Sequence, residues 1–302
     1  MANSNKKNLA SNGGFLDRVV FVPLTNHTED LEWLASKADG ISSYRVASTG
    51  KSLVDTVEDK SALIVWIDGD VVFLEDHTIP TMVKTKLDRP YSLVVSANVI
   101  NQAALARLHS HPSIALSYLP ELQPTQPADR DTWRASTLPR WKGPSGFQIR
   151  KGFPMLKEHR WLPSDNEAFD RTPIGTSIYP DDDPDWDEWT VKAQQHYSFL
   201  HHLELDDLRR YRFPIWKNPP ESISTSCLCF MGYNVRSVEP YLMQEKQDAA
   251  SSLSESEARS GKEITIDGKG VAAEYSSDHK SQGLDSTDVL RRYRSYAREM
   301  VC

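Results

Sequence analysis

The sequence is poor in cysteine and has no long hydrophobic run. Its 302 residues include three cysteines, Cys227, Cys229 and Cys302, which do not make a disulfide framework. No apolar run approaches the ~18 residues that cross a bilayer, and the polar, Asn/Lys-rich start does not resemble a secretory signal. We therefore expect a cytoplasmic protein with reduced thiols that does not bind a membrane.

Several nucleotide and hydrolase motifs are also missing. The sequence has no Gly-x-Gly-x-x-Gly, no Walker loop and no Gly-x-Ser-x-Gly elbow, which leaves hydride transfer with a dinucleotide and serine hydrolysis weakly supported. Cys227 and Cys229 have no second cysteine pair, so we do not expect a structural zinc site.

The composition is that of a folded, mildly acidic protein. Apolar residues make up 39% of the chain, enough for a hydrophobic core. Lys and Arg total 35 against 42 for Asp and Glu, giving a net charge of −7. This balance argues against a general nucleic-acid coat but leaves room for local basic patches.

The first 110 residues alternate between short apolar runs and helical patterns. After a predicted disordered leader over residues 1–17, strands are expected at 19–24, 44–47, 61–67 and 92–97. Helices are expected at 28–38, 51–58, 79–87 and 102–109. Strands that are apolar on both faces and alternate with helices indicate an α/β fold with a Rossmann-type central sheet covered by helices.

The remainder of the chain is more irregular. Residues 111–240 are rich in Pro and Trp, apart from one long helical pattern over 186–210. Residues 243–262 are rich in Ser, Glu and Ala and predict a flexible insert. A C-terminal strand and helix are expected within 263–302. We therefore treat 18–302 as one domain.

Two carboxylates at the end of the third predicted strand form the sharpest motif. Asp68 and Asp70 flank Gly69 directly after an apolar run. At the carboxyl edge of a parallel sheet, two hard oxygen ligands of this kind could share Mg²⁺ or Mn²⁺ with phosphate oxygens. Asp-Gly between apolar runs is also a hairpin signal, so a simple turn is the alternative.

An acidic run and a nearby histidine are the candidates for acid–base chemistry. Asp185, Asp187 and Glu188 lie among tryptophans just before His196 on the long predicted helix. Like charges beside an apolar ring could raise the pKa of one carboxyl group enough for it to act as a general base. The alternatives are a solvated acidic turn at a helix start and a structural histidine.

Two basic clusters could bind a pyrophosphate or an RNA backbone. The first comprises Arg209, Arg210 and Arg212, and the second begins at Arg291 and Arg292. Either could equally be a solvated helix face. His279, in the segment after the insert, could complete a metal site or contact a phosphate.

At residues 67–73 and 79–87 the chain resembles a large, mostly uncharacterised group of fungal glycosyltransferase-like proteins. Further matching stretches are residues 95–101, 193–200 and 288–296, so the resemblance spans most of 18–300. It implies a GT-A-like fold in which residues 18–110 bind the nucleotide and 111–240 face the acceptor. The relatives tend to carry a late histidine where this chain has Glu274, which leaves His279 as the substitute third metal ligand.

The resemblance implies a metal-dependent transferase that uses a nucleotide-sugar donor and an unknown small-molecule acceptor. Asp68 and Asp70 would hold Mn²⁺ or Mg²⁺ against the donor diphosphate. The strand end at Pro23, Leu24 and Thr25 would line the nucleoside pocket. Asp187 or Glu188 would act as the base.

Two alternatives remain open. The chain is also similar to fungal arginine-containing cyclodipeptide synthases, which would make it an aminoacyl-tRNA-dependent enzyme whose Arg210, Arg212, Arg291 and Arg292 bind tRNA. The other alternative is a binding module that retains the fold without catalysis. It would suit two departures from the relatives, which often carry three consecutive acids where this chain has Gly69 in the middle, and a histidine where it has Glu274.

Overall fold

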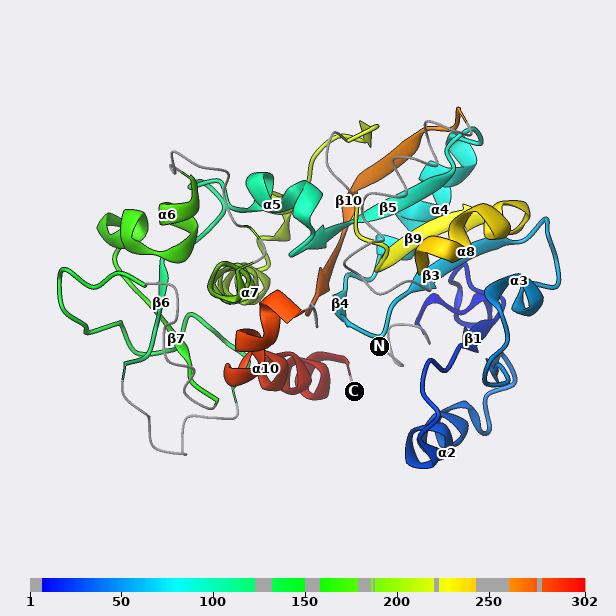
Figure 1. The fold of residues 1–302 in the computed structure, drawn as a ribbon, viewed down its shortest axis with the longest axis horizontal. Coiled ribbons are helices and arrows are strands. Elements are labelled where there is room, and N and C mark those ends of the chain that lie inside the picture. The colour runs from blue at the N-terminus through cyan, green and yellow to red at the C-terminus, as the bar shows by residue number, and fades with distance from the viewer. Residues whose placement is uncertain are drawn as a thin grey trace.

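The structure of the protein is a computed structural model that describes residues 7–122, 132–149, 158–178, 186, 188–219, 223–242, 261–275 and 279–301. The fold is mixed α/β, as the sequence predicts (Figure 1). The strands are β1 Val19–Phe21, β2 Tyr44–Val46, β3 Leu63–Ile67, β4 Val71–Leu74, β5 Val94–Ile100, β6 Tyr118–Pro120, β7 Trp161–Pro163, β8 Trp216–Lys217, β9 Cys227–Met231 and β10 Ile264–Glu274. The α-helices are α2 Thr28–Ala38, α3 Leu53–Thr56, α4 Thr78–Asp88, α5 Ala103–His109, α6 Pro173–Ile178, α7 Trp189–Glu204, α8 Val235–Leu242 and α10 Val289–Tyr296.

The largest sheet in the described part of the chain has six strands in the order β3-β9-β5-β10-β4, with β8 also paired to β10. β5 and β10 are parallel, whereas β9 is antiparallel to both β3 and β5. β3, β5 and β10 therefore run in the same direction, while β4 and β8 pair antiparallel with β10. The sheet is mixed, not the all-parallel sheet that the apolar runs predict.

β10 is the strand around which the sheet is organised. It pairs with β4, β5 and β8, and its register shifts between Asp267 and Val271. Gly268 lies inside this irregularity, where an added Cβ would come within 2.2 Å of the Phe213 carbonyl oxygen. The close approach of the two backbones requires glycine at this position.

The N-terminal strands form a separate small sheet. β1 and β2 pair in parallel with each other, and their register joins Val19 to Tyr44. The described part of the predicted disordered leader is ordered. Leu9 forms a bridge with Leu16 and is 4% exposed, so this segment packs against the protein although its composition is polar.

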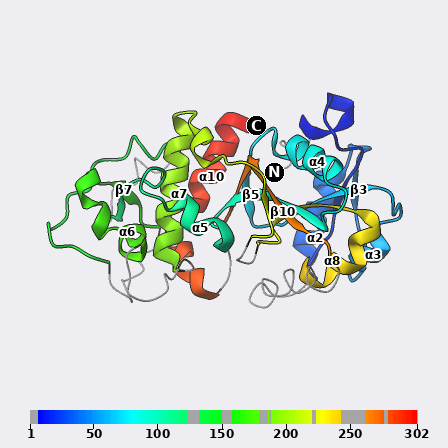
Figure 2. The ribbon, with the colours of Figure 1, turned by 90° about the horizontal axis from the view of Figure 1, so that it is seen from above.

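The second part of the molecule is built around α7. Figures 1 and 2 show α5, α6 and α7 with the β6–β7 pair on one side of the molecule and the large sheet on the other. Most of α7 is buried although it carries Gln194, Gln195, His196 and Ser198. A helix buried on all sides is usually apolar, and this one is instead satisfied by hydrogen bonds.

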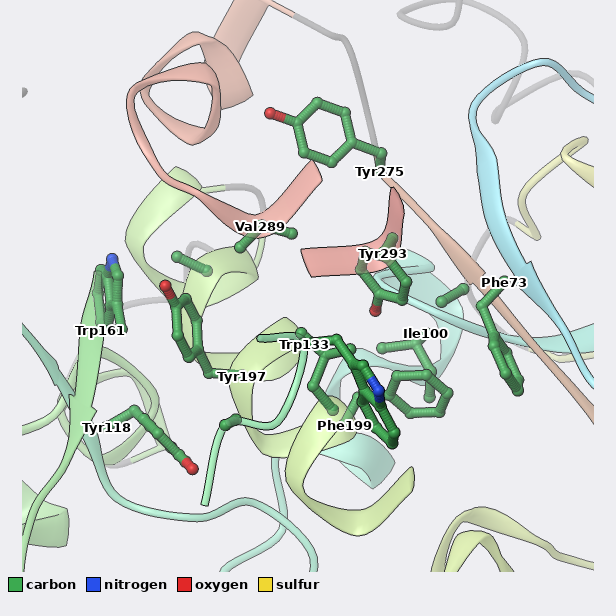
Figure 3. Packing of buried hydrophobic residues seen from close by; sticks show 14 of the residues in the cluster. Phe73, Ile100, Tyr118, Trp133, Trp161, Tyr197, Phe199, Tyr275, Val289 and Tyr293 are labelled. Carbon is green, nitrogen blue, oxygen red and sulfur yellow. The ribbon is translucent and has the colours of Figure 1, made fainter. Parts of the chain in front are cut away.

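An aromatic core joins the two parts. Figure 3 shows Tyr197 and Phe199 of α7 between Trp161 on β7 and Phe73 on β4. The rings of Phe73 and Phe199 meet edge to face at 5.1 Å, and those of Tyr118 and Tyr197 lie 5.5 Å apart. Aromatic pairs in this geometry add about 0.5–1.5 kcal/mol beyond the area they bury.

The large sheet draws on segments from both of the predicted halves. β9, from the segment expected to face an acceptor, lies between β3 and β5 of the segment expected to bind a nucleotide.

Most of the predicted insert, residues 243–260, is outside the described residues. No helix within the described ranges is long and apolar enough to cross a membrane.

Candidate functional site at the carboxyl edge of the sheet

Three parallel strands end at the same edge of the large sheet. β3 ends at Ile67, β5 at Ile100 and β10 at Glu274, and the antiparallel strands β9 and β4 begin beside them at Cys227 and Val71. Open α/β sheets bind ligands outside the carboxyl ends of their strands. The residues that follow these ends are therefore the first candidates for a functional site.

Asp68 and Asp70 lie at this edge and do not form a hairpin. The strands on either side of them have different partners, because β3 pairs with β9 and β4 pairs with β10. The Asp68 N–H donates to the Ser226 carbonyl oxygen at 2.8 Å, and the Tyr275 N–H donates to that of Asp70 at 2.8 Å. The hairpin interpretation of Asp68 and Gly69 is therefore wrong: the segment joins two strands at opposite ends of the strand order.

Gly69, between the two aspartates, faces open space. The Asp70 N–H donates to Oδ1 of Asp68 at 3.0 Å, which fixes the turn between them. Both side chains are partly exposed, and an added Cβ at Gly69 would have no atom within 4 Å. A ligand could therefore approach the backbone between the carboxylates.

A buried carboxylate and two hydroxyls lie at the same edge. Glu274, at the end of β10, is 5% exposed. The Ser224 hydroxyl donates to Oε2 of Glu274 at 2.8 Å, and its oxygen is 2.6 Å from that of Ser226. Because the Ser226 carbonyl oxygen accepts the Asp68 N–H, the two serines link Glu274 to the aspartate turn.

Asn101 ties the end of β5 to β10 and α7. It adopts φ 72°, a left-handed conformation that few residues other than glycine accept. Its Nδ2 donates to the Glu274 carbonyl oxygen at 3.2 Å and lies 2.6 Å from Nε2 of His196. Its Oδ1 is buried and has no hydrogen-bond partner among the described residues.

His196, a predicted catalytic residue, lies in the interior. It is 0% exposed, and its Nδ1 is 2.9 Å from the Tyr293 hydroxyl. Burial lowers the pKa of His196 to about 3, so the ring is neutral at neutral pH. Both ring nitrogens have protein partners, which suits a structural role better than exchange of protons with a substrate.

The predicted acidic site can be followed only in part. Asp185 and Asp187 lie outside the described residues. Glu188 is partly exposed and precedes α7, where its carbonyl oxygen accepts the N–H groups of Val191 and Lys192. At roughly 1.5 Å per residue, Glu188 lies about 12 Å along the helix from His196. The acidic run is therefore displaced along α7 from the residues that contact Asn101.

Arg292, a predicted phosphate ligand, is buried in an ion pair. It is 1% exposed and binds Asp288 through Nε at 3.0 Å and Nη2 at 2.9 Å. The Tyr197 hydroxyl also donates to Asp288. Arg291 is half-buried, with Asp288 and Glu158 at 3.5 and 3.7 Å. The structure thus places Arg292 in the core between α7 and α10.

The other basic cluster is paired with acidic side chains. Arg209 and Arg210 contact Asp207, and Arg212 donates to Glu75 at 2.7 Å. Arg209 is 83% exposed, so this cluster is on the surface. Any polyanion that bound here would have to compete with these carboxylates.

The predicted nucleoside pocket belongs to the small sheet. Pro23, Leu24 and Thr25 follow β1; Pro23 is buried, but Leu24 is 74% exposed. The Thr25 hydroxyl donates to Asp30 at 3.0 Å and shapes the turn before α2. Within the described residues, β1 pairs only with β2, so no strand pairing joins this segment to the aspartate edge.

The third predicted metal ligand falls in a 3₁₀ helix over His279–Ser286, but the side chain of His279 is outside the described part. In the part of the chain that is described, no group of three or more His, Cys, Asp or Glu side chains is arranged to hold a metal ion. Asp68 and Asp70 are thus a pair that would need ligands from elsewhere.

Sequence reasoning missed Ser224, Ser226 and Asn101 as members of this edge. Asn101 could have been found, because it directly follows the apolar run that forms β5. The two serines precede β9, whose place between β3 and β5 no local pattern reveals.

A search of protein-family models finds no match to the chain, and a search of curated proteins likewise finds none.

Proposed function

We propose that the protein is a metal-dependent transferase that acts on a nucleotide-activated sugar, with Asp68 and Asp70 as the residues that hold the cation. The observation that carries the proposal is the position of this pair: both carboxylates are partly exposed where three parallel strands end, with open space beside Gly69. A nucleoside diphosphate donor is the substrate class that this combination fits best.

The donor set suits Mg²⁺ or Mn²⁺. Both prefer oxygen ligands, keep several waters and complete their shell with phosphate oxygens, so two carboxylates from the protein are sufficient. When bound, the cation would supply positive charge for the leaving diphosphate. Asp68 and Asp70 would fix its position because backbone hydrogen bonds from both sides hold their turn.

Calorimetric titration of the full chain with UDP and GDP, with and without Mn²⁺, tests the proposal. Binding should require Mn²⁺, and Asp70→Asn should weaken it by at least about tenfold, which corresponds to about 1.4 kcal/mol. Asp88→Asn is the matched control, because Asp88 is exposed on α4 in an ion pair with Lys84. Nucleotide affinity that is the same with EDTA, or in Asp70→Asn, would contradict the proposal.

The tRNA-dependent alternative has less support from the arrangement of its residues. Arg210, Arg212 and Arg292 are all paired with carboxylates, and Arg292 is buried. RNase sensitivity of product formation would favour this alternative. A protein that binds Mn²⁺ and nucleotide but never turns over any donor would instead be the binding module.

A further inference from the structure

The segment from β1 to β2 buries very little of itself. Between Val19 and Val46 only Pro23 and Tyr44 are buried, and α2 has no buried residue. α2 packs against β2 and lies at the lower edge of the molecule in Figure 1. A helix of 11 residues is marginally stable alone and gains most of its stability by packing an apolar face. The exposed side of α2 is therefore a candidate interface.

Exposed apolar side chains are concentrated in the same part of the chain. Trp33, in the middle of α2, is 59% exposed. Single exposed apolar residues are normal on a protein surface, whereas a concentration of them indicates an interaction site. Among the described residues, eleven large hydrophobic side chains are exposed, and five of them lie within residues 15–46, namely Phe15, Val20, Leu24, Trp33 and Val46.

Trp33 lies in a stripe with a charge of opposite sign at each end. Glu29, Trp33 and Lys37 are spaced four residues apart, so they follow one face of α2, and all three are exposed. The Lys37 ammonium group lies 5.6 Å from the centre of the Trp33 ring, which shows that the two side chains share this face. Within the described part of the chain, neither Glu29 nor Lys37 belongs to an ion pair, so both charges are available to a partner.

This stripe is complementary to a second copy of itself. In an antiparallel pair of α2 helices related by a two-fold axis at Trp33, each residue meets the residue equally far beyond the axis. Glu29 and Lys37 each lie about 6 Å along the helix from Trp33, at roughly 1.5 Å per residue. Glu29 of each copy would therefore lie opposite Lys37 of the other, with the two Trp33 rings between the pairs.

A shallow hollow of about 600 Å³ flanks the stripe. It lies between α2, where Ala35 and Ser36 line it, and the strand β2, whose three residues also line it. Ser36 follows Trp33 by three residues, so the hollow opens beside the same exposed face. The small side chains of Ala35 and Ser36 leave room there for side chains of a second helix.

We propose that the exposed face of α2 is an interface for a second copy of this chain, with Trp33 at the two-fold axis and Glu29 paired with Lys37 of the other copy. The enclosed Trp33 side chains would supply most of the affinity, and the ion pairs would fix the antiparallel direction. One short helix from each copy makes a small interface, so we expect a dissociation constant of about 10–100 μM. This inference does not depend on the proposed function.

Sedimentation velocity of the full chain at concentrations from about 1 to about 300 μM tests the proposal. The unmodified chain should pass from monomer to dimer over this range, and Trp33→Ser should weaken dimerisation at least about tenfold. Tyr91→Ser is the matched control, because Tyr91 is an aromatic residue that is 85% exposed outside residues 15–46. It should dimerise like the unmodified chain, and circular dichroism should show both variants to be folded.

Charge reversal tests the direction of the two helices. Glu29→Lys or Lys37→Glu alone places like charges opposite each other, so each variant should dimerise at least about tenfold more weakly. In an equimolar mixture of the two variants every introduced charge meets its opposite, and heterodimers should form with an affinity within about threefold of the unmodified chain. Recovery in the mixture also shows that neither variant is misfolded.

Three outcomes would overturn the proposal. A chain that stays monomeric up to about 300 μM leaves this face to a different partner. A dimer that Trp33→Ser does not weaken is formed through another surface. A dimer that both charge reversals weaken but that mixing does not restore excludes the antiparallel two-fold arrangement.

Discussion

The polar groups at the carboxyl edge of the sheet and those beneath α7 are of similar kinds but differ in what surrounds them. At the edge, Asp68 and Asp70 are partly exposed and are held through their backbones. Beneath α7, Asp288 and Arg292 are almost fully buried and are held through their side chains. Burial, and not residue type, thus distinguishes groups that stabilise the fold from groups that a ligand can reach.

The buried ion pair should give the largest effect on stability. Asp288→Asn leaves the Arg292 guanidinium in the core without its countercharge, so we expect a loss of about 3–5 kcal/mol in the free energy of unfolding. Urea denaturation followed by circular dichroism measures it. Asp88→Asn, which breaks an exposed pair, should stay within about 0.5 kcal/mol. Equal losses in the two variants would remove the distinction between the regions.

The neutral histidine should give the next largest effect. His196→Leu leaves the Tyr293 hydroxyl in the core without its partner and removes one of the two contacts of Asn101 Nδ2. We expect a loss of about 1–3 kcal/mol. His111→Leu is the control, because His111 is exposed and, among the residues described, its imidazole is hydrogen-bonded only to Ser113. A stability unchanged by His196→Leu would mean that the hydrogen bonds contribute nothing net.

Acid should weaken the fold through two buried histidines. Burial lowers the pKa of both His109 and His196 from 6.5 to about 3. Above pH 6.5 both histidines are neutral in the folded and in the unfolded chain, so they do not lower the free energy of unfolding. As the pH falls from 6.5 toward 3, the unfolded chain binds protons that the folded chain does not, and stability decreases by up to about 1.4 kcal/mol per pH unit for each histidine.

The measurement is urea denaturation of the unmodified chain and His109→Gln at several pH values between 7 and 4. In the variant, the part of the acid-induced decrease in the free energy of unfolding that comes from these two histidines should be about half as large. If the free energy of unfolding changed equally with pH in both proteins, His109 would be protonated in the folded state.

The smallest effect on stability is expected at the edge itself. Asp70→Asn keeps the backbone hydrogen bonds that hold the turn, so the free energy of unfolding should change by less than about 1 kcal/mol. Thermal unfolding measures this, and the same variant should lose most of its Mn²⁺-dependent nucleotide affinity. A large destabilisation without a change in binding would make Asp70 a structural residue like Asp288.

Local sequence patterns predict several helices but not which of their residues are buried. The helices at 28–38, 79–87 and 102–109 were predictable because each has helical periodicity or a clear start and end, and α2, α4 and α5 lie there. The long helix was expected over 186–210, whereas α7 spans Trp189–Glu204. Its polar residues give no sign of burial in the sequence, because their hydrogen-bond partners, such as Ser110 and the Leu116 carbonyl oxygen, come from a distant segment.

The amino-acid sequence by itself determined the class of the fold, most of the strands and helices, and the presence of two aspartates at the end of β3. These depend on interactions between residues close together in the chain. The tertiary structure alone decided that β9 separates β3 from β5, that the end of β10 lies between Asn101 and Asp70, and that Arg292 and His196 are buried. Those outcomes depend on pairing between strands more than 100 residues apart, which local periodicity does not encode.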